Sequence, residues 1–124
     1  MCLVNVIVWS LFVATVASAD LTGGWTLEFH TPGSQNVYSG VCAFKQEGER
    51  LAGSCGSGPT TPVPVTGTLK GSSATFQFKT GLDAGLTVVF SGQLDEQETS
   101  ITGAWRSVDQ DGNMGEGIFT ATKQ

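Results

Sequence analysis

Few residues in this chain have side chains that could carry out acid–base, nucleophilic or metal chemistry. His30 is the only histidine, so the sequence offers neither a histidine metal cluster nor a paired histidine for proton transfer. The alternation of the residues around His30 places its side chain on the outer, solvated face of a strand. No serine lies in a segment typical of a nucleophile elbow. We therefore predict no catalytic residue, and the sequence favours a non-enzymatic protein.

The segment "DQDGN", which begins at Asp109, has the acidic spacing of a calcium-binding loop. That loop needs a glycine where this chain has Met114 and a bidentate glutamate where it has Thr120. The segment is better interpreted as a hairpin loop. We predict no metal site and no cofactor.

Two cysteines, Cys42 and Cys55, flank the turn sequence "EGER". If strand pairing is centred between Gly48 and Glu49, the two cysteines face each other in a closely spaced, non-hydrogen-bonded pair that a disulfide can bridge. If Glu47 and Gly48 form the turn instead, the register shifts and the cysteines do not pair. We predict the disulfide; the alternative is two small buried residues.

The first 19 residues are apolar, carry no charge and end in Ala17-Ser18-Ala19, a pattern typical of signal-peptide cleavage. A basic residue near the start is missing, and a retained membrane anchor is the alternative. We expect cleavage near Ala19 and a secreted or periplasmic protein. Residues 20–124 then form one β-barrel domain with no membrane span.

The remaining composition excludes some partners. The chain has 6 basic and 11 acidic residues, a net charge of −5, and no basic run. Nucleic acids and anionic membrane surfaces are therefore not expected as partners.

Apolar and polar residues alternate with a period of two through most of residues 20–124, which is typical of strands with one buried face. Eight such segments can be distinguished: 25–29, 38–44, 51–55, 63–69, 74–78, 86–94, 101–105 and 119–121. Short antiparallel strands in sequence can bury this face by closing into a barrel without exposed edges. We predict an all-β, eight-stranded, antiparallel up-and-down barrel; a β-sandwich is the alternative.

Glycine recurs midway between two apolar residues, as in "ITGAW" at Ile101 and "FSGQL" at Phe90. In each case the glycine is two residues from each apolar neighbour, so it has the same parity, lies on the same face of the strand and points inward. An inward glycine lets a strand bend and lets neighbouring backbones approach closely. The missing side-chain volume favours a small, mostly apolar cavity; the alternative is that the backbone collapses into it.

The predicted connections alternate between short and long. Those near 47–50, 71–72 and 95–98 are tight, whereas those at 31–36, 56–62, 80–85 and 107–115 are long. Alternate connections of an up-and-down barrel lie at the same end. The long loops therefore share one open rim, where a ligand or a partner would bind.

Several segments resemble the avidin family and, more loosely, the lipocalin-like barrels. "LTGGWT" at Leu21 is similar to a first avidin strand and contains the lipocalin Gly-x-Trp as Gly23 and Trp25. "TVVFSGQL" at Thr87, "ITGAWRS" at Ile101 and "GIFTATK" at Gly117 are similar to later avidin strands. The resemblance covers most of residues 21–123 and implies the same barrel topology.

The biotin contacts of that family are mostly not retained. Leu27 stands where avidins have a polar residue for the ureido group, and Cys55 stands where they have a tyrosine. The resemblance does place an aromatic wall at Trp105 and Phe90, and extends it to Phe78. It therefore implies a retained scaffold with a different ligand.

From these observations we expect a secreted barrel that holds a small apolar or aromatic molecule in its mouth. The predicted ligand-binding residues are Phe29, Tyr38, Phe78, Leu86, Phe90 and Trp105. One alternative is a protein-binding module, such as a small-barrel protease inhibitor, with its partner at the long-loop rim. Another is a small barrel enzyme of the isomerase or cyclase kind, which would need a buried ionisable group in the cavity.

Overall fold

A computed structural model describes residues 19–33, 35, 37–56, 62–80 and 84–124. Apart from Ala19, the predicted signal peptide lies outside the described residues. Parts of three long loops also lie outside them.

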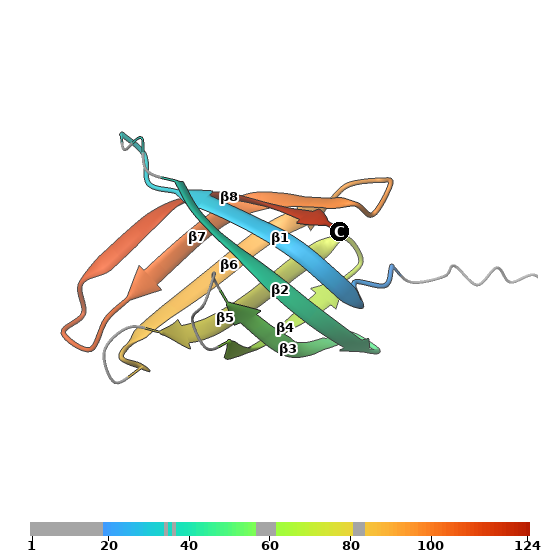
Figure 1. Cartoon of the computed structure of the whole chain (residues 1–124), viewed down its shortest axis with the longest axis horizontal. Coiled ribbons are helices and arrows are strands. Elements are labelled where there is room, and N and C mark those ends of the chain that lie inside the picture. The colour runs from blue at the N-terminus through green and yellow to red at the C-terminus, as the bar shows by residue number, and fades with distance from the viewer. Residues whose placement is uncertain (1–18, 34, 36, 57–61, 81–83) are drawn as a thin grey trace, which may run out of the picture.

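The chain folds into a closed antiparallel barrel in which each strand pairs with the next and β8 pairs with β1 (Figure 1). The strands are β1 (Gly23–His30), β2 (Val37–Glu47), β3 (Arg50–Gly56), β4 (Val63–Lys70), β5 (Ser73–Thr80), β6 (Leu86–Leu94), β7 (Ser100–Val108) and β8 (Met114–Lys123). The predicted eight-stranded up-and-down barrel is confirmed, and each expected segment lies in its own strand.

The hairpin between β2 and β3 has the register that the disulfide requires. Glu47 pairs with Arg50, so Gly48 and Glu49 form the turn, and Cys42 lies opposite Cys55. Their Cα atoms are 4.0 Å apart and their sulfur atoms are bonded. The predicted bridge is confirmed. Such bridges persist in oxidising compartments, which fits an extracytoplasmic location.

The core consists of the inward-facing residues of all eight strands, as their alternation predicts. Four phenylalanines fill its middle: Phe76 stacks on Phe90 with ring centroids 5.0 Å apart. The ring of Phe119 meets Phe90 edge-on at 5.1 Å, and that of Phe44 meets Phe76 at 5.2 Å. Edge-to-face and offset pairs of this kind stabilise a core beyond the area that they bury.

The inward glycines allow the strands to approach closely. A Cβ at Gly67 would lie 2.7 Å from Cα of Phe76 on β5 and would also meet the carbonyl oxygen of Thr75. A Cβ at Gly92 would lie 2.9 Å from Cζ of Phe119. Side chains at these positions would push neighbouring strands apart, so glycine is required by the barrel's tight curvature.

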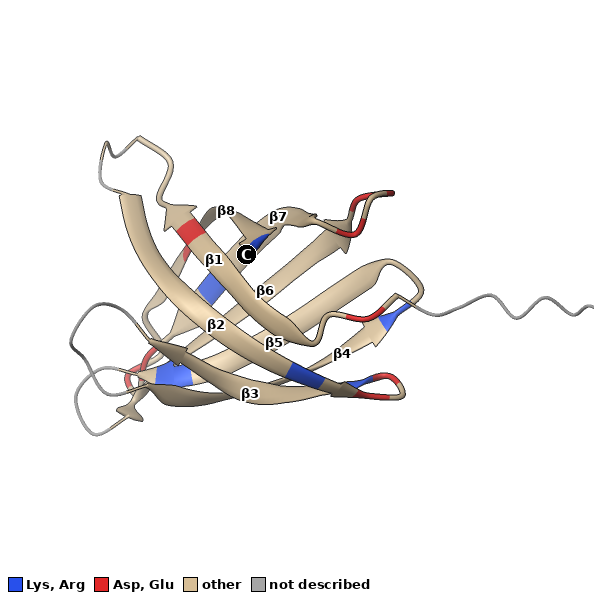
Figure 2. Ribbon diagram, turned by 45° about the vertical axis from the view of Figure 1, so that its right-hand side comes forward, with Lys and Arg blue, Asp and Glu red and all other residues tan. Residues whose placement is uncertain are grey.

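The end of the barrel that carries the tight turns is closed by residues that precede β1. Leu21 is fully buried, and its carbonyl oxygen accepts a 2.9 Å hydrogen bond from Nε1 of the fully buried Trp25. Gln46 holds the same segment, because its Oε1 accepts from the N–H of Leu21 and its Nε2 donates to the carbonyl oxygen of Ala19. Figure 2 shows acidic residues in the turns at this end, between β2 and β3 and between β6 and β7. We call it the closed end.

The long connections lie at the other end, which we call the open end (Figure 1). The loop between β7 and β8 is organised by Asp109. Its Oδ1 atom accepts the backbone N–H groups of Asp111 at 2.9 Å and Asn113 at 2.8 Å. These hydrogen bonds lower the pKa of the Asp109 carboxyl, with the Asn113 N–H as the main cause. The segment is thus a hydrogen-bonded hairpin loop, as expected.

Candidate functional site

A cavity of about 450 Å³ lies at the open end, bordered by β1, β2, β3, β4 and β5. This volume is within the usual range of small-molecule sites. Its described lining consists of Leu27, Phe29, Val37, Tyr38, Ser39, Gly40, Val41, Cys42, Cys55, Gly56, Val63, Phe78 and Thr80. Apolar side chains and the disulfide dominate this set, and none of these residues is charged.

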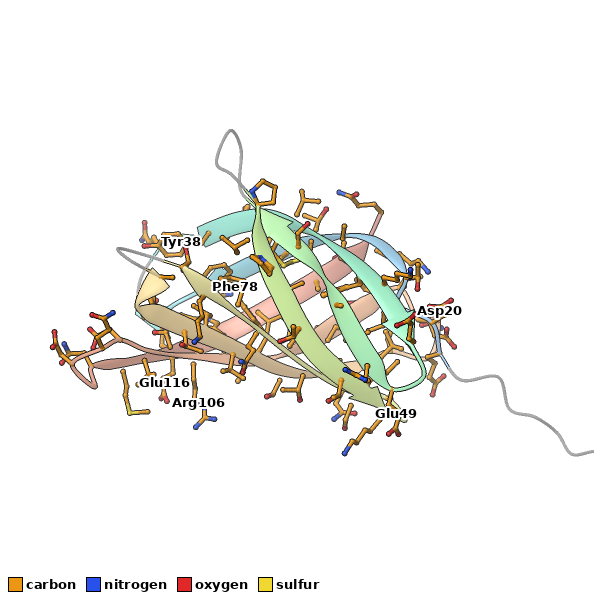
Figure 3. All side chains as sticks on the ribbon, turned by 90° about the horizontal axis from the view of Figure 1, so that it is seen from below. Asp20, Tyr38, Glu49, Phe78, Arg106 and Glu116 are labelled. Atoms are coloured by element: carbon orange, nitrogen blue, oxygen red, sulfur yellow. A yellow bond between two sulfur atoms is a disulfide. The ribbon has the colours of Figure 1, made fainter. Side chains whose placement is uncertain are left out.

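Three predicted ligand-binding residues line the cavity: Phe29 from β1, Tyr38 from β2 and Phe78 from β5. The rings of Phe29 and Tyr38 are stacked, with centroids 5.5 Å apart. Tyr38 is 53% exposed, so its ring stands at the entrance rather than in the core. Figure 3 shows Tyr38 and Phe78 at the same end of the barrel, far from Asp20 and Glu49 at the closed end.

The other three predicted residues, Leu86, Phe90 and Trp105, are not part of the described lining. Phe90 is fully buried, and its ring contacts Phe29 and Phe78 at centroid distances of 5.6 Å. It therefore supports two lining residues from within the core. Leu86 is partly buried and packs against the core cluster.

Trp105 lies beside the cavity and supports its wall. Its ring meets that of Phe29 at 5.6 Å, and its Nε1 donates a 3.1 Å hydrogen bond to the carbonyl oxygen of His30. To reach β1 from β7, the indole must cross β8, and it does so at Gly117, its partner in the β7–β8 register. A Cβ at Gly117 would lie 2.6 Å from Nε1 of Trp105 and would also meet the carbonyl oxygen of His30. Gly117 thus leaves room for the indole of Trp105 on β7 to pass over β8 and contact Phe29 and His30 on β1.

The sequence did not predict that residues from both faces of β2 would belong to the cavity lining. Val37, Ser39 and Val41 are part of it, although they have the opposite parity to the buried Cys42 and Phe44. Alternation within β2 could indicate which face each side chain occupies, but not that the cavity reaches residues of the outer face.

None of the described lining residues carries a charged side chain. In the described part of the chain, no charged or polar residue is fully buried, and no group of three or more potential metal ligands occurs. The same residues contain no helix long and apolar enough to span a membrane. The described lining can therefore provide aromatic and apolar contacts and the hydroxyl groups of Tyr38 and Thr80.

Comparison with models of known protein families gave no match for the chain. Comparison with curated proteins gave no significant relative either. The similarity of single segments to avidins and lipocalin-like barrels therefore remains a resemblance, and the site is interpreted from its own geometry.

Proposed function

We propose that this protein binds a small apolar or aromatic molecule in the cavity at the open end of the barrel. The observation that carries the proposal is the cavity itself, which has a volume of about 450 Å³ and is lined by the rings of Phe29, Tyr38 and Phe78, with no charged side chain among its described lining residues. Burying an aromatic ligand against such walls is favourable by about 25 cal/mol per Å² of apolar surface removed from water. We further propose that the protein is secreted or periplasmic, in keeping with its disulfide and its apolar leader.

Titration with N-phenylnaphthylamine, a neutral dye that fluoresces in apolar surroundings, tests this function. We expect a saturable signal with the purified protein. Phe78→Ala should weaken binding by about 1–3 kcal/mol, because a large aromatic contact with the ligand is lost.

The matched control is Ile118→Ala, which removes an apolar side chain that is 57% exposed on the outer face of β8. This variant should bind the dye as the unchanged protein does. If no saturable signal occurs, or if both variants lose affinity equally, the cavity is not the binding site.

A protein partner at the open end is the second candidate function. The large hydrophobic residues that are exposed, among those described, lie on β2, β7 and β8: Val37, Tyr38, Val41, Val108, Met114 and Ile118. Val37 and Ile118 both pair with His30 of β1, so they flank it on the outer wall. Exposed apolar groups of this kind are typical of interaction surfaces. Ile118→Glu should abolish capture of such a partner while leaving dye binding intact.

The enzyme alternative depends on an ionisable group buried in the cavity. The described lining holds no charged side chain, and its one phenol, that of Tyr38, is exposed and not buried, so this part of the chain gives that alternative no support.

A further inference from the structure

The disulfide between Cys42 and Cys55 belongs to the lining of the cavity. Both cysteines have the inward parity of their strands, and they are only 1% and 5% exposed. The proposed function uses the bridge only as part of the wall. A buried disulfide that faces a cavity reacts with whatever molecule reaches it from there, so its surroundings decide which reagents can attack it.

Hydrogen-bonded strands cover the bridge on both flanks. Cys42 pairs with Trp25 of β1, and Cys55 pairs with Val63 of β4. Because the two cysteines also pair with each other, the ladder is continuous across this part of the barrel wall. A reagent on the outer face therefore meets backbone and not sulfur.

Along the barrel axis, the two sides of the bridge differ. Toward the closed end, the next inward side chain of β2 is Phe44, which is buried and meets Phe76 edge-on at 5.2 Å. The next inward residue of β4, Val65, is also buried. Toward the open end, the neighbouring pair is Leu27 with Gly40, and both residues line the cavity. The cavity is therefore the side from which the sulfur atoms can be approached.

We propose that the Cys42–Cys55 bridge is a thiol-exchange site in the wall of the ligand cavity, and that a bound ligand shields it from reduction. In the empty protein, a small dithiol such as dithiothreitol enters the cavity. Its thiolate attacks one sulfur atom of the bridge, the S–S bond breaks, and the other cysteine leaves as a thiolate. The second thiol of the reagent then displaces the first cysteine and closes the reagent's own disulfide ring. The reagent thus loses two electrons and the bridge gains them.

The ligand and the dithiol compete for the same space. The rings that would hold a ligand, those of Phe29, Tyr38 and Phe78, line the same cavity as the two cysteines. A thiolate must contact the sulfur atom that it attacks, so a ligand that fills this volume excludes it. This inference rests on the proposed function, since the shield is the ligand proposed above, and it adds that occupancy of the cavity controls the chemical state of the bridge.

The test measures how fast dithiothreitol reduces the bridge in the folded protein, by acid quenching, alkylation and mass spectrometry. The rate should be proportional to the dithiothreitol concentration and nearly unchanged by low concentrations of urea. A bridge that reacts only after unfolding would instead react about fivefold faster or more for each molar of urea, because the unfolded fraction rises. With N-phenylnaphthylamine at about nine times its Kd, the rate should fall about tenfold, because only the empty fraction of the protein reacts.

Val63→Phe provides a shield without a ligand. Val63 lines the cavity and pairs with Cys55, so a larger side chain there fills part of the space beside the bridge. This variant should be reduced more slowly than the unchanged protein. The matched control is Ile118→Phe, which enlarges an exposed side chain on the outer face of β8 and should leave the rate unchanged. Both variants are compared at urea concentrations where the rate does not depend on urea.

The outcomes separate this inference from the proposed function. A rate that rises with urea from the lowest concentrations, or equal rates for the two variants, would overturn the cavity as the route to the bridge. Saturable dye binding without protection of the bridge would overturn the shielding and leave the aromatic site standing. If the dye does not bind but Val63→Phe is reduced more slowly than Ile118→Phe, the exchange site stands and the proposed function is wrong.

Discussion

Gly117 lies where the indole of Trp105 crosses β8, and replacing it with alanine tests whether that crossing holds the wall of the cavity. The new Cβ would lie 2.6 Å from Nε1 and 2.9 Å from Cε2 of Trp105, and it would meet the carbonyl oxygen of His30. Two of these neighbours belong to a rigid ring and one to the backbone. The indole must therefore move, and its hydrogen bond to His30 is lost.

Gly115→Ala is a matched control on the same strand and the same face. Its Cβ would lie 2.9 Å from Oγ of Ser107, a hydroxyl that can rotate away, and 3.6 Å from Cζ3 of Trp105, an ordinary contact. Replacing glycine with alanine lowers the conformational entropy of the unfolded chain, which stabilises the folded protein by about 0.4–1 kcal/mol. This stabilisation is the same in both variants and cancels in the comparison. The lost hydrogen bond costs about 0.5–1.5 kcal/mol and the overpacking about 1–3 kcal/mol. We expect Gly117→Ala to be less stable than Gly115→Ala by about 2–4 kcal/mol.

Urea unfolding followed by far-UV circular dichroism measures this difference in the free energy of unfolding. In thermal unfolding, the melting temperature should fall by about 4–8 °C for each kcal/mol. The emission of Trp105 should also shift to longer wavelength in Gly117→Ala, since the ring leaves its buried position. Equal stability of the two variants, or unchanged emission, would refute the role of Gly117 as the crossing point.

Two further predictions concern the bridge and the loop at the open end. Cys42→Ser combined with Cys55→Ser should lower the free energy of unfolding by about 2–5 kcal/mol, and the unreduced protein should be two hydrogens lighter by mass spectrometry than the reduced one; free thiols in the exported protein would contradict this. For Asp109, hydrogen bonds hold the folded pKa below its usual value, so its stabilising contribution is present above that usual value and is lost as the pH falls through the lowered pKa. Thermal unfolding at several pH values should therefore show that Asp109→Asn is less stable than the unchanged protein at neutral pH, and that this difference shrinks in acid. A difference independent of pH would rule out the charged carboxylate as its source.

The fold could be predicted from the sequence because the information is local. Alternation gave the inward face of each strand, and the turn at Gly48 and Glu49 fixed the register that pairs Cys42 with Cys55. The alternative turn at Glu47 and Gly48 was wrong, since Glu47 pairs with Arg50. The backbone at Gly48 has φ 62°, a conformation that glycine adopts without strain, which favours the observed turn.

The closed end was predicted only in part. Trp25 belongs to the alternating segment 25–29, whose pattern predicts one buried face, and it is fully buried. Leu21 lies before the first strand but shares the inward parity of Gly23 and Trp25, so the sequence indicated its inward face but not the contacts that bury it. Its position depends on contacts that are distant in sequence, with Gln46 of β2 holding its N–H.

The cavity lies at the end that the long connections indicated, but the height of each residue along the barrel axis was not predicted. Parity tells which residues point inward, whereas height depends on strand tilt and stagger, which only the closed barrel defines. Phe29, Tyr38 and Phe78 reach the cavity. Phe90 has the same parity yet lies in the packed middle, in contact with both Phe76 and Phe119.

The position of the cavity has a different physical origin from the one that the glycines indicated. Missing side chains at Gly67, Gly92 and Gly117 leave space, but Phe76, Phe119 and Trp105 respectively fill it, as the short distances from a hypothetical Cβ at each position require. These glycines therefore make the middle of the barrel dense.

The cavity lies instead toward the open end, beyond this dense middle, and its described lining comes from β1 to β5. Phe29 and Phe78 belong to that lining, and both rings contact Phe90 of the core with centroids 5.6 Å apart. The packed aromatic middle thus supports the walls of the cavity and contributes none of its volume.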